Sequence, residues 1–430
     1  VGGAAQGSMS GGMSEIWQEG LRVPVMRLYS RGQLNRELMD ILLLNMRLPD
    51  ERRGDLNAQI AACHLGVERM QALFARYGTN TVTSAFAEIL QRTDRRMKAA
   101  IAQIPDGSYS FEDVLDDDGL EARDILFKLE VRKKGERIVF DFTGSSRQVP
   151  GNVNLTLNAV QSAVCYGLKA LLDPELPNNQ AAIDAIDIVA PLGSIANCVS
   201  PGAVALRANT CQRVVDVVIG ALADVLPEQA IGAANGANTS IVFAGVDPAT
   251  NIPYVYLETL GGGMGGRSDR DGKDGVQVHI TNTSNLPIEA IEMEYPLRVD
   301  SYGFVENSGG AGTYRGGLGL RRVVRPIGHT CEMNGVGERF RHQPWGLFGG
   351  APGASGRFRM READGAIDEL PPKTGRRRLR PEQAVIVETP GAGGYGKPAE
   401  RVPEDVARDR QSEKFSIDFL GKHYPQSSSD

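Results

Sequence analysis

Residues 125–142, ILFKLEVRKKGERIVFDF, mark the point where the sequence changes from a helical to an extended pattern. On both sides of Lys133-Lys134-Gly135-Glu136, apolar residues occupy every second position, which is the period of a β-strand with one buried face. Two such runs joined by a short polar turn with a glycine indicate a β-hairpin. We predict that this hairpin belongs to a mixed α/β segment covering residues 108–240.

The segment upstream of the hairpin, residues 34–104, has a helical pattern in three stretches. In the second and third stretches apolar residues recur at steps of three and four, which predicts an apolar stripe on each helix. Pro105-Asp106-Gly107 then ends the helical region, so residues 1–107 form an N-terminal segment followed by helices. The two stripes consist of Leu56, Ile60, Cys63, Val67, Met70, Phe74 and of Ala85, Ile89, Thr93, Met97, Ile101, Ile104. Because Cys63 belongs to a stripe, we expect the pair Cys63-His64 to pack in or beside the core.

Downstream of the hairpin, helices are predicted at residues 155–173 and 210–226, with a strand at residues 183–190 between them. Residues 241–415 consist mainly of short strand-like runs separated by Gly and Pro, which indicates a β-rich domain. Residues 416–430 are expected to form a flexible tail. The sequence thus predicts an α+β fold, with a helical and mixed front half and a β-rich, Gly-containing back half.

The composition is that of a folded protein without a nucleic-acid-binding surface. Apolar residues make up 41% of the 430 residues and charged residues 23%, which is enough for a large core. The net charge is −6, and the densest basic run, Arg376-Arg377-Arg378, is too short for a nucleic-acid surface. No apolar run reaches the ~18 residues of a membrane span, and the start of the sequence does not resemble a signal peptide.

The cysteines and histidines predict neither disulfides nor a metal site. The five cysteines are odd in number and contain no CxxC pair, which favours free thiols in a reducing compartment, so the cytoplasm is the expected location. The five histidines show no HxH or HxxxH spacing. This chain alone therefore predicts no metal site.

The 51 glycines occur in clusters, two of which resemble nucleotide-binding motifs. Gly261-Gly262-Gly263-Met264-Gly265-Gly266 matches GxGxxG, but a second strand-like run follows instead of the helix that a dinucleotide site requires. Residues 391–397 match GxxxxGK, but Pro398 stands where an ATP-binding loop needs Ser or Thr. Neither motif predicts nucleotide binding. Gly261, Gly262 and Gly263 are interpreted either as a wall close to a ligand or another chain, or as a long turn.

A polar cluster follows the first glycine motif. Residues 276–281 alternate as a strand with His279 on its polar face, and Asn282, Asn285 and Glu289 come soon afterwards. An imidazole, two amides and a carboxylate at one strand end can orient a substrate carbonyl or relay a proton. The alternative is an exposed strand face with Asx turns.

Asn209-Thr210-Cys211-Gln212-Arg213 opens the helix predicted at residues 210–226. Asn or Thr suits a helix N-cap, and a thiol near a helix N-terminus can have a lowered pKa. Cys211 is therefore either a reactive thiol or, because no partner histidine is apparent, a small residue packed at the cap.

Several stretches together resemble the hydantoinase B family. That family includes the B-type parts of ATP-dependent 5-oxoprolinases and N-methylhydantoinases, and subunits of acetone and acetophenone carboxylases. The stretches occur in family order along nearly the whole chain. They are EIWQEGLRVP (15–24), RGDLNAQIAA (53–62), DFTGSS (141–146), QRVVD (212–216), GGG (261–263), TNTSN (281–285), YPLR (295–298), SGGAG (308–312), RGG (315–317) and TPGAGGYG (389–396).

The resemblance implies a subunit that works with an A-type partner, which binds ATP and activates a lactam or cyclic imide by phosphorylation. It also implies a divalent metal, with zinc, manganese and iron left open. The metal ligands are expected upstream of Val1, just before a Val-Gly-Gly like Val1-Gly2-Gly3, so this chain alone is expected to be inactive. Cys211 and the preceding Leu206-Arg207-Ala208 depart from the family pattern, which leaves the substrate open.

The leading hypothesis is therefore a B-type subunit of a hydrolase that opens 5-oxoproline or a hydantoin, working in a hetero-oligomer. His279 and Glu19 are the expected catalytic residues. The expected substrate contacts are Asn282, Asn285, Glu289, Arg213, Gly261, Gly262 and Gly263. A ketone carboxylase subunit is the alternative within the family, and a non-catalytic interface fragment without the metal site is the alternative outside it.

Overall fold

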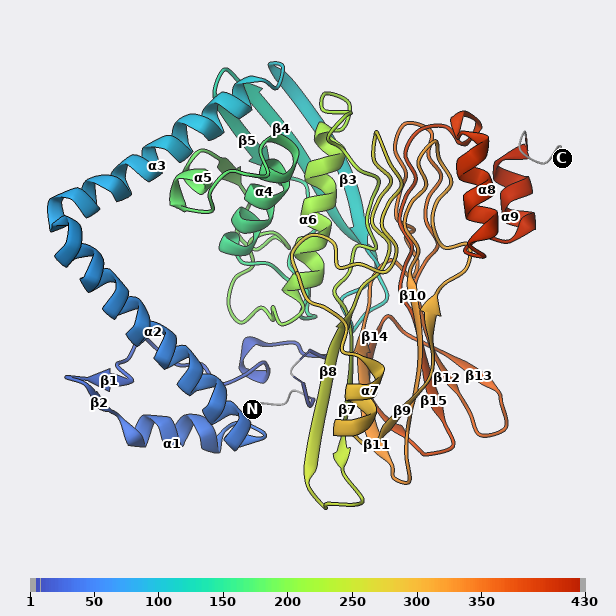
Figure 1. Cartoon of the computed structure of the whole chain (residues 1–430), viewed down its shortest axis with the longest axis horizontal. Coiled ribbons are helices and arrows are strands. Elements are labelled where there is room, and N and C mark those ends of the chain that lie inside the picture. The colour runs from blue at the N-terminus through green and yellow to red at the C-terminus, as the bar shows by residue number, and fades with distance from the viewer. Residues whose placement is uncertain (1–4, 8, 426–430) are drawn as a thin grey trace.

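The computed structural model describes residues 5–7 and 9–425 and confirms the α+β fold (Figure 1). The front half contains long helices and a sheet covered by helices, and the back half contains two further sheets and the glycine clusters. Val1, Gly2 and Gly3 lie outside the described residues.

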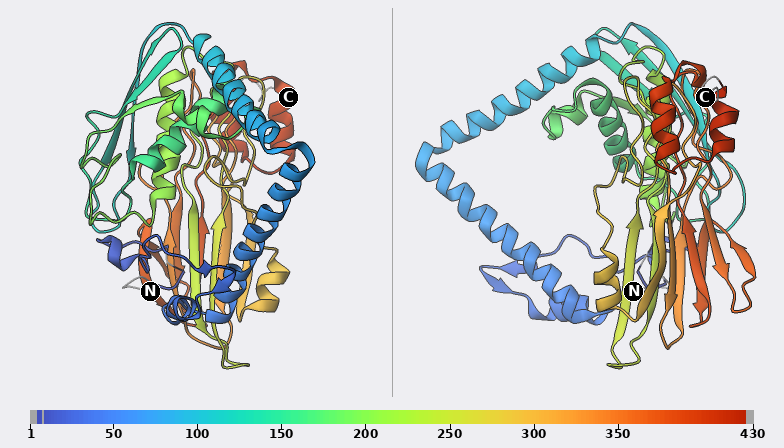
Figure 2. Two further views of the ribbon diagram at one scale, coloured as in Figure 1. Left: turned by 90° about the vertical axis from the view of Figure 1, so that its left-hand side faces the viewer. Right: turned by 45° about the vertical axis from the view of Figure 1, so that its right-hand side comes forward.

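The N-terminal part consists of a 3-10 turn, a two-stranded ribbon and three helices. Its elements are η1 (Ile16–Gln18), β1 (Tyr29–Ser30), β2 (Gln33–Leu34), α1 (Arg36–Leu44), α2 (Pro49–Tyr77) and α3 (Thr79–Ala102). Helices α2 and α3 meet at Gly78, whose φ is +82°, and form an arm that stands away from the rest of the molecule (Figure 2). Met97 and Ile101 anchor the far end of α3, because both are fully buried in the main core.

The second predicted helical stretch forms as α2, but its apolar stripe is not part of the core. None of its residues is buried, and Val67 is 57% exposed. Cys63 is exposed, and the His64 ring lies edge-on to Tyr29, with 5.5 Å between the ring centroids. The prediction that Cys63-His64 packs in or beside the core is therefore wrong, because the turn at Gly78 carries α2 away from the core that α3 reaches.

A four-stranded sheet with helices against it forms the centre of the front half. Its strands are β3 (Gly107–Leu115), β4 (Ile125–Lys134), β5 (Arg137–Asp141) and β6 (Asp187–Val189), and the helices are α4 (Leu157–Leu172), α5 (Gln180–Asp184) and α6 (Arg207–Leu222). The predicted hairpin is confirmed, since β4 and β5 pair antiparallel with Val131 opposite Phe140. Phe127 of β4 shares the main core with Val214 and Val218 of α6.

The strand predicted at residues 183–190 is only half correct. Its first residues complete α5, and β6 begins at Asp187 and pairs in parallel with β5. Asn179 starts the helix, because its Oδ1 accepts a hydrogen bond from Ala181 N at 3.1 Å. This side-chain cap favours a helix where the apolar run alone indicated a strand.

Two sheets form a β-sandwich in the back half. Their orders are β14-β11-β7-β8 and β13-β12-β15-β10-β9. The elements are β7 (Thr239–Val246), β8 (Pro253–Leu260), α7 (Ile288–Glu294), β9 (Leu297–Phe304), β10 (Leu320–Pro326), β11 (Cys331–Val336), β12 (Arg357–Arg361), β13 (Ile367–Leu370), β14 (Lys373–Leu379) and β15 (Ala384–Glu388). Phe243 and Met333 of the first sheet share a buried core with Phe358 and Val385 of the second.

The glycine clusters form a bundle of extended segments, which lies between α6 and the C-terminal end of the chain (Figure 1). The segments hydrogen-bond to one another through their backbones, as where Gly263 N donates to Pro390 O at 3.1 Å. A Cβ atom on Gly263 would overlap the carbonyl oxygen of Gly317, and one on Gly393 would overlap that of Trp345. Glycine therefore allows these segments of the same chain to pass one another at backbone distance.

Neither nucleotide-like motif has the local structure of a nucleotide site. Residues 267–287 contain no helix after the first motif, and Gly262 instead forms a bridge with Val276. Directly after the second motif comes the 3-10 turn η2 (Pro398–Glu400) instead of the α-helix that an ATP-binding loop precedes. Both motifs belong to the glycine bundle.

Two short helices, α8 (Pro403–Gln411) and α9 (Ile417–His423), pack beside the glycine bundle. The flexible tail predicted at residues 416–430 is therefore wrong over residues 416–425, while the last five residues lie outside the described part. Ser416 caps α9 by accepting a hydrogen bond from Phe419 N at 3.2 Å. Leu420 and Tyr424 are buried beside Leu318, so apolar contacts hold a segment of mostly polar composition.

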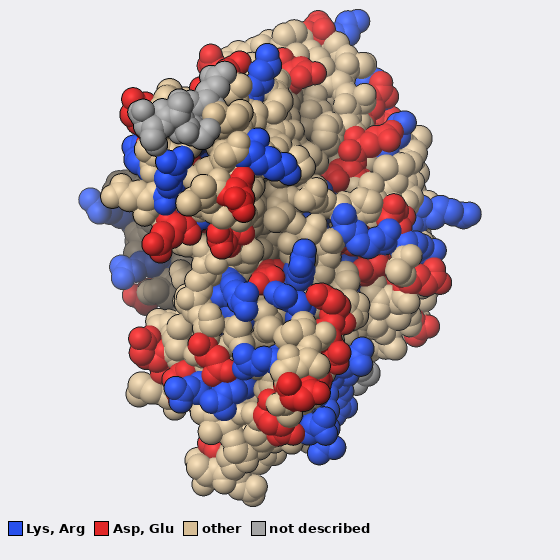
Figure 3. Space-filling view, turned by 90° about the vertical axis from the view of Figure 1, so that its right-hand side faces the viewer, with Lys and Arg blue, Asp and Glu red and all other residues tan. Residues whose placement is uncertain are grey.

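The face that carries the C-terminal helices shows basic and acidic side chains interspersed over its surface (Figure 3). Charges of the two signs also pair within the chain, for example Arg361 with Asp300 at 3.1 Å. Within residues 5–7 and 9–425, no helix has the length and apolar character to cross a membrane.

Candidate functional site

Helix α6 is the element around which three of the predicted site residues lie. Glu19 binds the backbone just before the helix, His279 lies against its side, and Arg213 is part of it. A cavity of about 530 Å³ opens at the N-terminal end of this helix. This cavity, termed the α6 pocket, is lined by Met9, Glu19, Ala159, Ala205, Arg207, Ala208, Cys211 and Ile280.

Glu19 is held at the α6 pocket by backbone hydrogen bonds. Its Oε1 accepts from Val204 N at 2.6 Å and from Ala205 N at 2.7 Å. Burial raises the pKa of Glu19, while these two hydrogen bonds and the charge of Arg207 oppose the rise. Glu19 thus reaches the α6 pocket from the first segment of the chain.

The start of α6 differs from the prediction. The helix begins at Arg207, with Leu206 as its N-cap, so Asn209 and Thr210 lie inside the first turns instead of capping them. Their side chains bind neighbouring segments: Thr210 Oγ1 donates to Val153 O at 2.6 Å, and Asn209 Oδ1 accepts from Asn238 N at 3.0 Å. Because the Asn209 and Thr210 side chains bond to these neighbouring segments, they do not cap the helix, and its N-terminal end lies three residues earlier than predicted.

Cys211 is a buried thiol at the floor of the α6 pocket. Burial raises the pKa of Cys211 to about 12, and its Sγ contacts Ala159 O at 3.9 Å. This direction is opposite to that of a thiol activated at a helix N-terminus. The alternative interpretation of Cys211, a small packed residue, agrees with its burial.

His279 does not lie on a strand. Only Val276 of the strand predicted at residues 276–281 forms a bridge, and that bridge joins it to Gly262. Gly275 and His279 both have left-handed backbones, with φ of +61° and +59°. Two left-handed residues interrupt an extended path, which is why the alternating pattern does not become a strand.

The His279 ring is buried between helices α4 and α6. Its Nδ1 lies 3.2 Å from the hydroxyl of Tyr166, and the two rings meet edge-on. Its Nε2 lies 4.0 Å from Asp216 Oδ1. Burial lowers the pKa of His279 to about 4, so the ring is neutral at pH 7. The next residue, Ile280, lines the α6 pocket.

Arg213 belongs to a buried cluster of charges that also contains Asp216, the residue near His279. Its Nη1 lies 3.0 Å from Asp113 Oδ2 and 3.4 Å from Asp216 Oδ2. Arg339 binds the same two carboxylates at 2.7 Å each, and Trp345 donates to Asp113 at 3.0 Å. Burial raises the pKa of Asp216 to about 8, an effect that Arg213 opposes. Because Arg213 is fully buried in this cluster, its side chain connects the sheet to the back half and does not face the α6 pocket.

The other predicted substrate contacts lie apart from the α6 pocket. Asn285 Nδ2 donates to the hydroxyl of Tyr302 on β9 at 2.6 Å, and Asn282 and Glu289 are exposed. Gly261, Gly262 and Gly263 are buried within the glycine bundle. The structure therefore places Glu19 and His279 beside α6, whereas the asparagines, Glu289 and the three glycines lie elsewhere.

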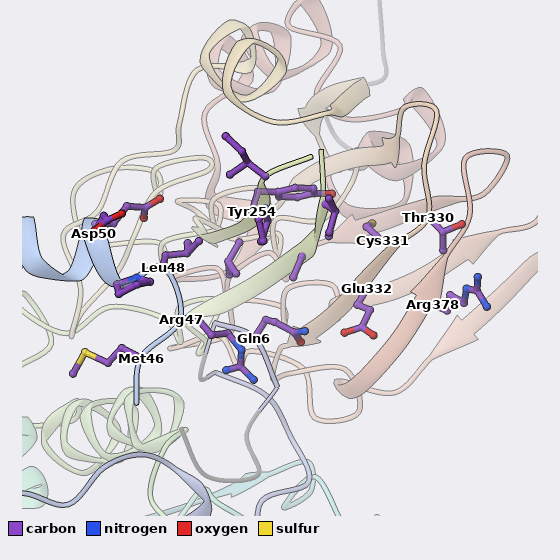
Figure 4. A pocket seen from close by; sticks show the side chains of 18 residues that line it. Gln6, Met46, Arg47, Leu48, Asp50, Tyr254, Thr330, Cys331, Glu332 and Arg378 are labelled. Atoms are coloured by element: carbon purple, nitrogen blue, oxygen red, sulfur yellow. The ribbon is translucent and has the colours of Figure 1, made fainter. Parts of the chain in front are cut away.

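Two larger cavities lie elsewhere. One, of about 1130 Å³, lies between the turn joining α1 to α2 and the strands β7, β8 and β11, with Leu48, Tyr254 and Glu332 among its lining residues (Figure 4). It contains none of the predicted site residues. The second, about 750 Å³, lies between α4 and α5 and includes Tyr166 and Lys169. Tyr166 thus connects His279 to a second opening on the same side of α4.

No group of three or more His, Cys, Asp or Glu within the described ranges is arranged to hold a metal ion. Among the donors around α6, Asp216 is bound by Arg213 and Arg339, and Cys211 is buried. The described part of the chain therefore does not form a metal centre.

Sequence reasoning did not select Arg207, Tyr166 or Asp216 as site residues. Asp216 stands inside the motif QRVVD, so the resemblance contained a signal for it. Tyr166 is a polar residue on a helix predicted from its apolar face, and its contact with His279 depends on the tertiary fold. The sequence marked Arg207 only as part of Leu206-Arg207-Ala208, a stretch that departs from the family pattern.

The hydantoinase B/oxoprolinase family model matches residues 1–398. An uncharacterized protein of Methanocaldococcus jannaschii is 37% identical over 99% of this chain and 73% of its own length. The B-type subunit of a putative D-/L-hydantoinase from a Pseudomonas species is 34% identical, covering 92% of this chain and 68% of the relative. The beta subunit of the Pseudomonas jessenii caprolactamase is 31% identical, covering 99% of this chain and 74% of the relative.

Solved structures agree with these relatives. The crystal structure of the ATP-dependent caprolactamase from Pseudomonas jessenii has a TM-score of 0.91 at 27% identity, covering 99% of this chain and 75% of that chain. A nucleotide-free structure of acetone carboxylase has the same fold, with a TM-score of 0.85 at 19% identity over 98% of this chain and 63% of that chain. The resemblance seen in the sequence motifs is therefore confirmed, and the chain belongs to the hydantoinase B/oxoprolinase family.

Proposed function

We propose that this chain is the B-type subunit of an ATP-dependent cyclic-amide hydrolase and acts with an ATP-binding A-type subunit. The similarity of nearly the whole chain to the ATP-dependent caprolactamase is the observation that carries the proposal. Relatives named as the corresponding subunits of a hydantoinase and a caprolactamase support the same substrate class. The proposed substrate of this chain is 5-oxoproline or a hydantoin.

The residues around α6 support ring-opening chemistry. Hydrolysis of an amide requires a group that takes a proton from water and returns one to the leaving nitrogen. His279 is suited to this role because its imidazole is neutral at pH 7 and Asp216 lies 4.0 Å from its Nε2. The Tyr166 hydroxyl, 3.2 Å from Nδ1, holds the ring in orientation.

We further propose that the complete enzyme requires a divalent metal, as the family resemblance implies. The described residues do not form a metal centre, so no residue of this chain is assigned as a ligand. The requirement is tested by treating the complex with a chelator and adding back zinc, manganese or iron singly. Activity that survives exhaustive chelation would contradict it.

The experiment that tests the proposed function is co-expression of the protein with its A-type neighbour. The purified complex should hydrolyse ATP when 5-oxoproline, a hydantoin or caprolactam is present. Without these compounds its rate of ATP hydrolysis should be close to zero. An ATPase rate that none of these compounds changes would contradict the proposal.

A subunit of a ketone carboxylase is the second candidate, because the acetone carboxylase structure has the same fold. Bicarbonate-dependent ATP turnover with acetone or acetophenone would select this candidate over the first. The same purified complex serves for both measurements.

A further inference from the structure

The α6 pocket combines apolar walls with two groups of opposite charge. Met9, Ala159, Ala208 and Ile280 provide apolar surface, while Glu19 and Arg207 provide an acceptor and a donor. Its volume of about 530 Å³ falls within the ~300–1,000 Å³ of small-molecule sites. A pocket of this kind fits a small, mostly apolar ring with a few polar atoms on one edge.

Glu19 has one carboxylate oxygen in use and one available. Oε1 accepts both backbone hydrogen bonds, from Val204 and Ala205, which fixes the orientation of the carboxylate. Within the described part of the chain, no hydrogen bond to Oε2 is formed. An oxygen fixed in this way at a pocket wall is an acceptor that a ligand N–H group can use.

Arg207 lies at the same pocket without forming an ion pair with Glu19. Its charge lowers the pKa of Glu19, but among residues 5–7 and 9–425 no ion pair within 4 Å engages it, and its Nη1 donates only a long hydrogen bond of 3.5 Å to Val204 O. The guanidinium therefore retains donors for a carbonyl oxygen. Glu19 and Arg207 can therefore act together on a ligand, Glu19 as a hydrogen-bond acceptor and Arg207 as a hydrogen-bond donor.

The amide of a small ring has the matching arrangement. Open-chain amides are trans, so N–H and C=O point in opposite directions. Ring closure holds the amide cis, which places N–H and C=O side by side on one edge. We propose that the α6 pocket binds this edge of a cyclic amide, with Glu19 accepting from the ring N–H and Arg207 donating to the ring carbonyl. This assignment rests on the proposed function and names its substrate-contact residues.

The test measures binding of ring amides to the 430-residue chain without ATP, by ligand-observed NMR. The probes are caprolactam, 5-oxoproline and hydantoin, together with N-methylcaprolactam, whose methyl group removes the N–H donor. Caprolactam is expected to bind at least ten times more tightly than N-methylcaprolactam. Equal affinity of the two, or no binding of any N–H probe, would overturn the proposal.

The variants separate the roles of the two residues. In Glu19→Gln the amide oxygen is needed by the two backbone N–H groups, so the new NH2 faces the pocket and opposes a ring N–H. This variant should lose the preference for caprolactam over its N-methyl form, while Arg207→Gln should weaken both by about tenfold. Glu369→Gln and Arg357→Gln, at exposed positions on β13 and β12, are the matched controls and should bind as the parent chain does. Unchanged binding in Glu19→Gln and Arg207→Gln would also overturn the proposal.

Comparing ligand binding with ATP turnover distinguishes failure of the α6 pocket assignment from failure of the proposed function. If the complex with its A-type subunit hydrolyses ATP in the presence of cyclic amides, but Glu19→Gln and Arg207→Gln leave KM and kcat unchanged, the α6 pocket assignment fails and the proposed function stands. If the variants alter binding as expected but no cyclic amide stimulates ATP hydrolysis, the proposed function fails. Thermal melting of every variant shows that the fold is retained.

Discussion

His279 combines three features: a left-handed backbone, a buried ring and two polar neighbours from different helices. A non-glycine residue in the left-handed region costs of order 1 kcal/mol or more and persists only where its surroundings hold it. Here the Tyr166 hydroxyl contacts the ring at Nδ1, and Asp216 lies 4.0 Å from Nε2. The left-handed backbone and the burial fit the role proposed for the side chain.

Burial of neutral His279 makes stability depend on pH. Its pKa is about 4 in the folded chain and about 6.5 when exposed, so the stabilisation is complete above pH 6.5 and is lost as the pH falls from 6.5 to 4. The full loss amounts to about 3.5 kcal/mol, since the two pKa values differ by about 2.5 and each pKa unit corresponds to about 1.4 kcal/mol. Urea unfolding at pH 7 and pH 4.5 should show that His279→Asn, which tolerates a left-handed backbone, loses less stability than the parent chain. Equal losses in the two proteins would contradict this account.

The buried charges behind α6 give a second prediction at the residue scale. Arg339 binds both Asp113 and Asp216, so Arg339→Met leaves two buried carboxylates with less compensation. Breaking a buried ion pair on one side typically costs about 3–5 kcal/mol, and we expect a loss of this size in denaturant unfolding. Arg357→Met, at an exposed position, should change the unfolding free energy by less than about 0.5 kcal/mol. A small effect of Arg339→Met would mean that the cluster does not hold the two halves together.

Among the elements, the glycine bundle depends on backbone contacts that leave no space for a side chain. Gly393→Ala would place a methyl group on the carbonyl of Trp345, and we expect a loss of about 3 kcal/mol or more, or failure to fold. Gly375 lies in β14 with open space around it, so Gly375→Ala is the matched control and should stay within about 0.5 kcal/mol of the parent chain. Equal melting temperatures of the two variants would contradict the close packing of the bundle.

The arm gives a contrast between two helices that the sequence describes in the same way. Val67 of α2 is largely exposed, whereas Met97 of α3 is fully buried. Val67→Ala should therefore cost less than about 0.5 kcal/mol, and Met97→Ala about 2–5 kcal/mol. Denaturant unfolding of the chain alone measures both. A large effect at Val67 in that measurement would show that the stripe on α2 is covered.

For the whole molecule, the sequence predicted those parts of the fold that depend on local patterns. The hairpin of β4 and β5 follows from period two and a turn, and α4 follows from its apolar face; both form close to where they were predicted. The position of α2 depends on the turn at Gly78, and the loss of the strand at His279 depends on two left-handed residues. The spacing of hydrophobic residues in the sequence does not predict which residues adopt a positive φ.

The candidate site was predicted less completely than the fold. Glu19 and His279 both lie beside α6, but Asn282, Asn285 and Glu289 were grouped with His279 because they are near it in sequence. The α6 pocket joins segments that are far apart along the chain, such as those of Met9, Arg207 and Ile280. Such an arrangement is set by the packing of the helices on the sheet, which no single stretch of sequence specifies.

The central claim, that this chain supplies the amide-binding part of an ATP-driven ring-opening enzyme, is tested most directly by product stoichiometry. Phosphate and ring-opened product are quantified in one reaction that contains the chain, its A-type partner, ATP and a cyclic amide. The account predicts that both products appear in equal amounts, and only when all four components are present. Phosphate release without ring opening, or ring opening that does not need this chain, would contradict it.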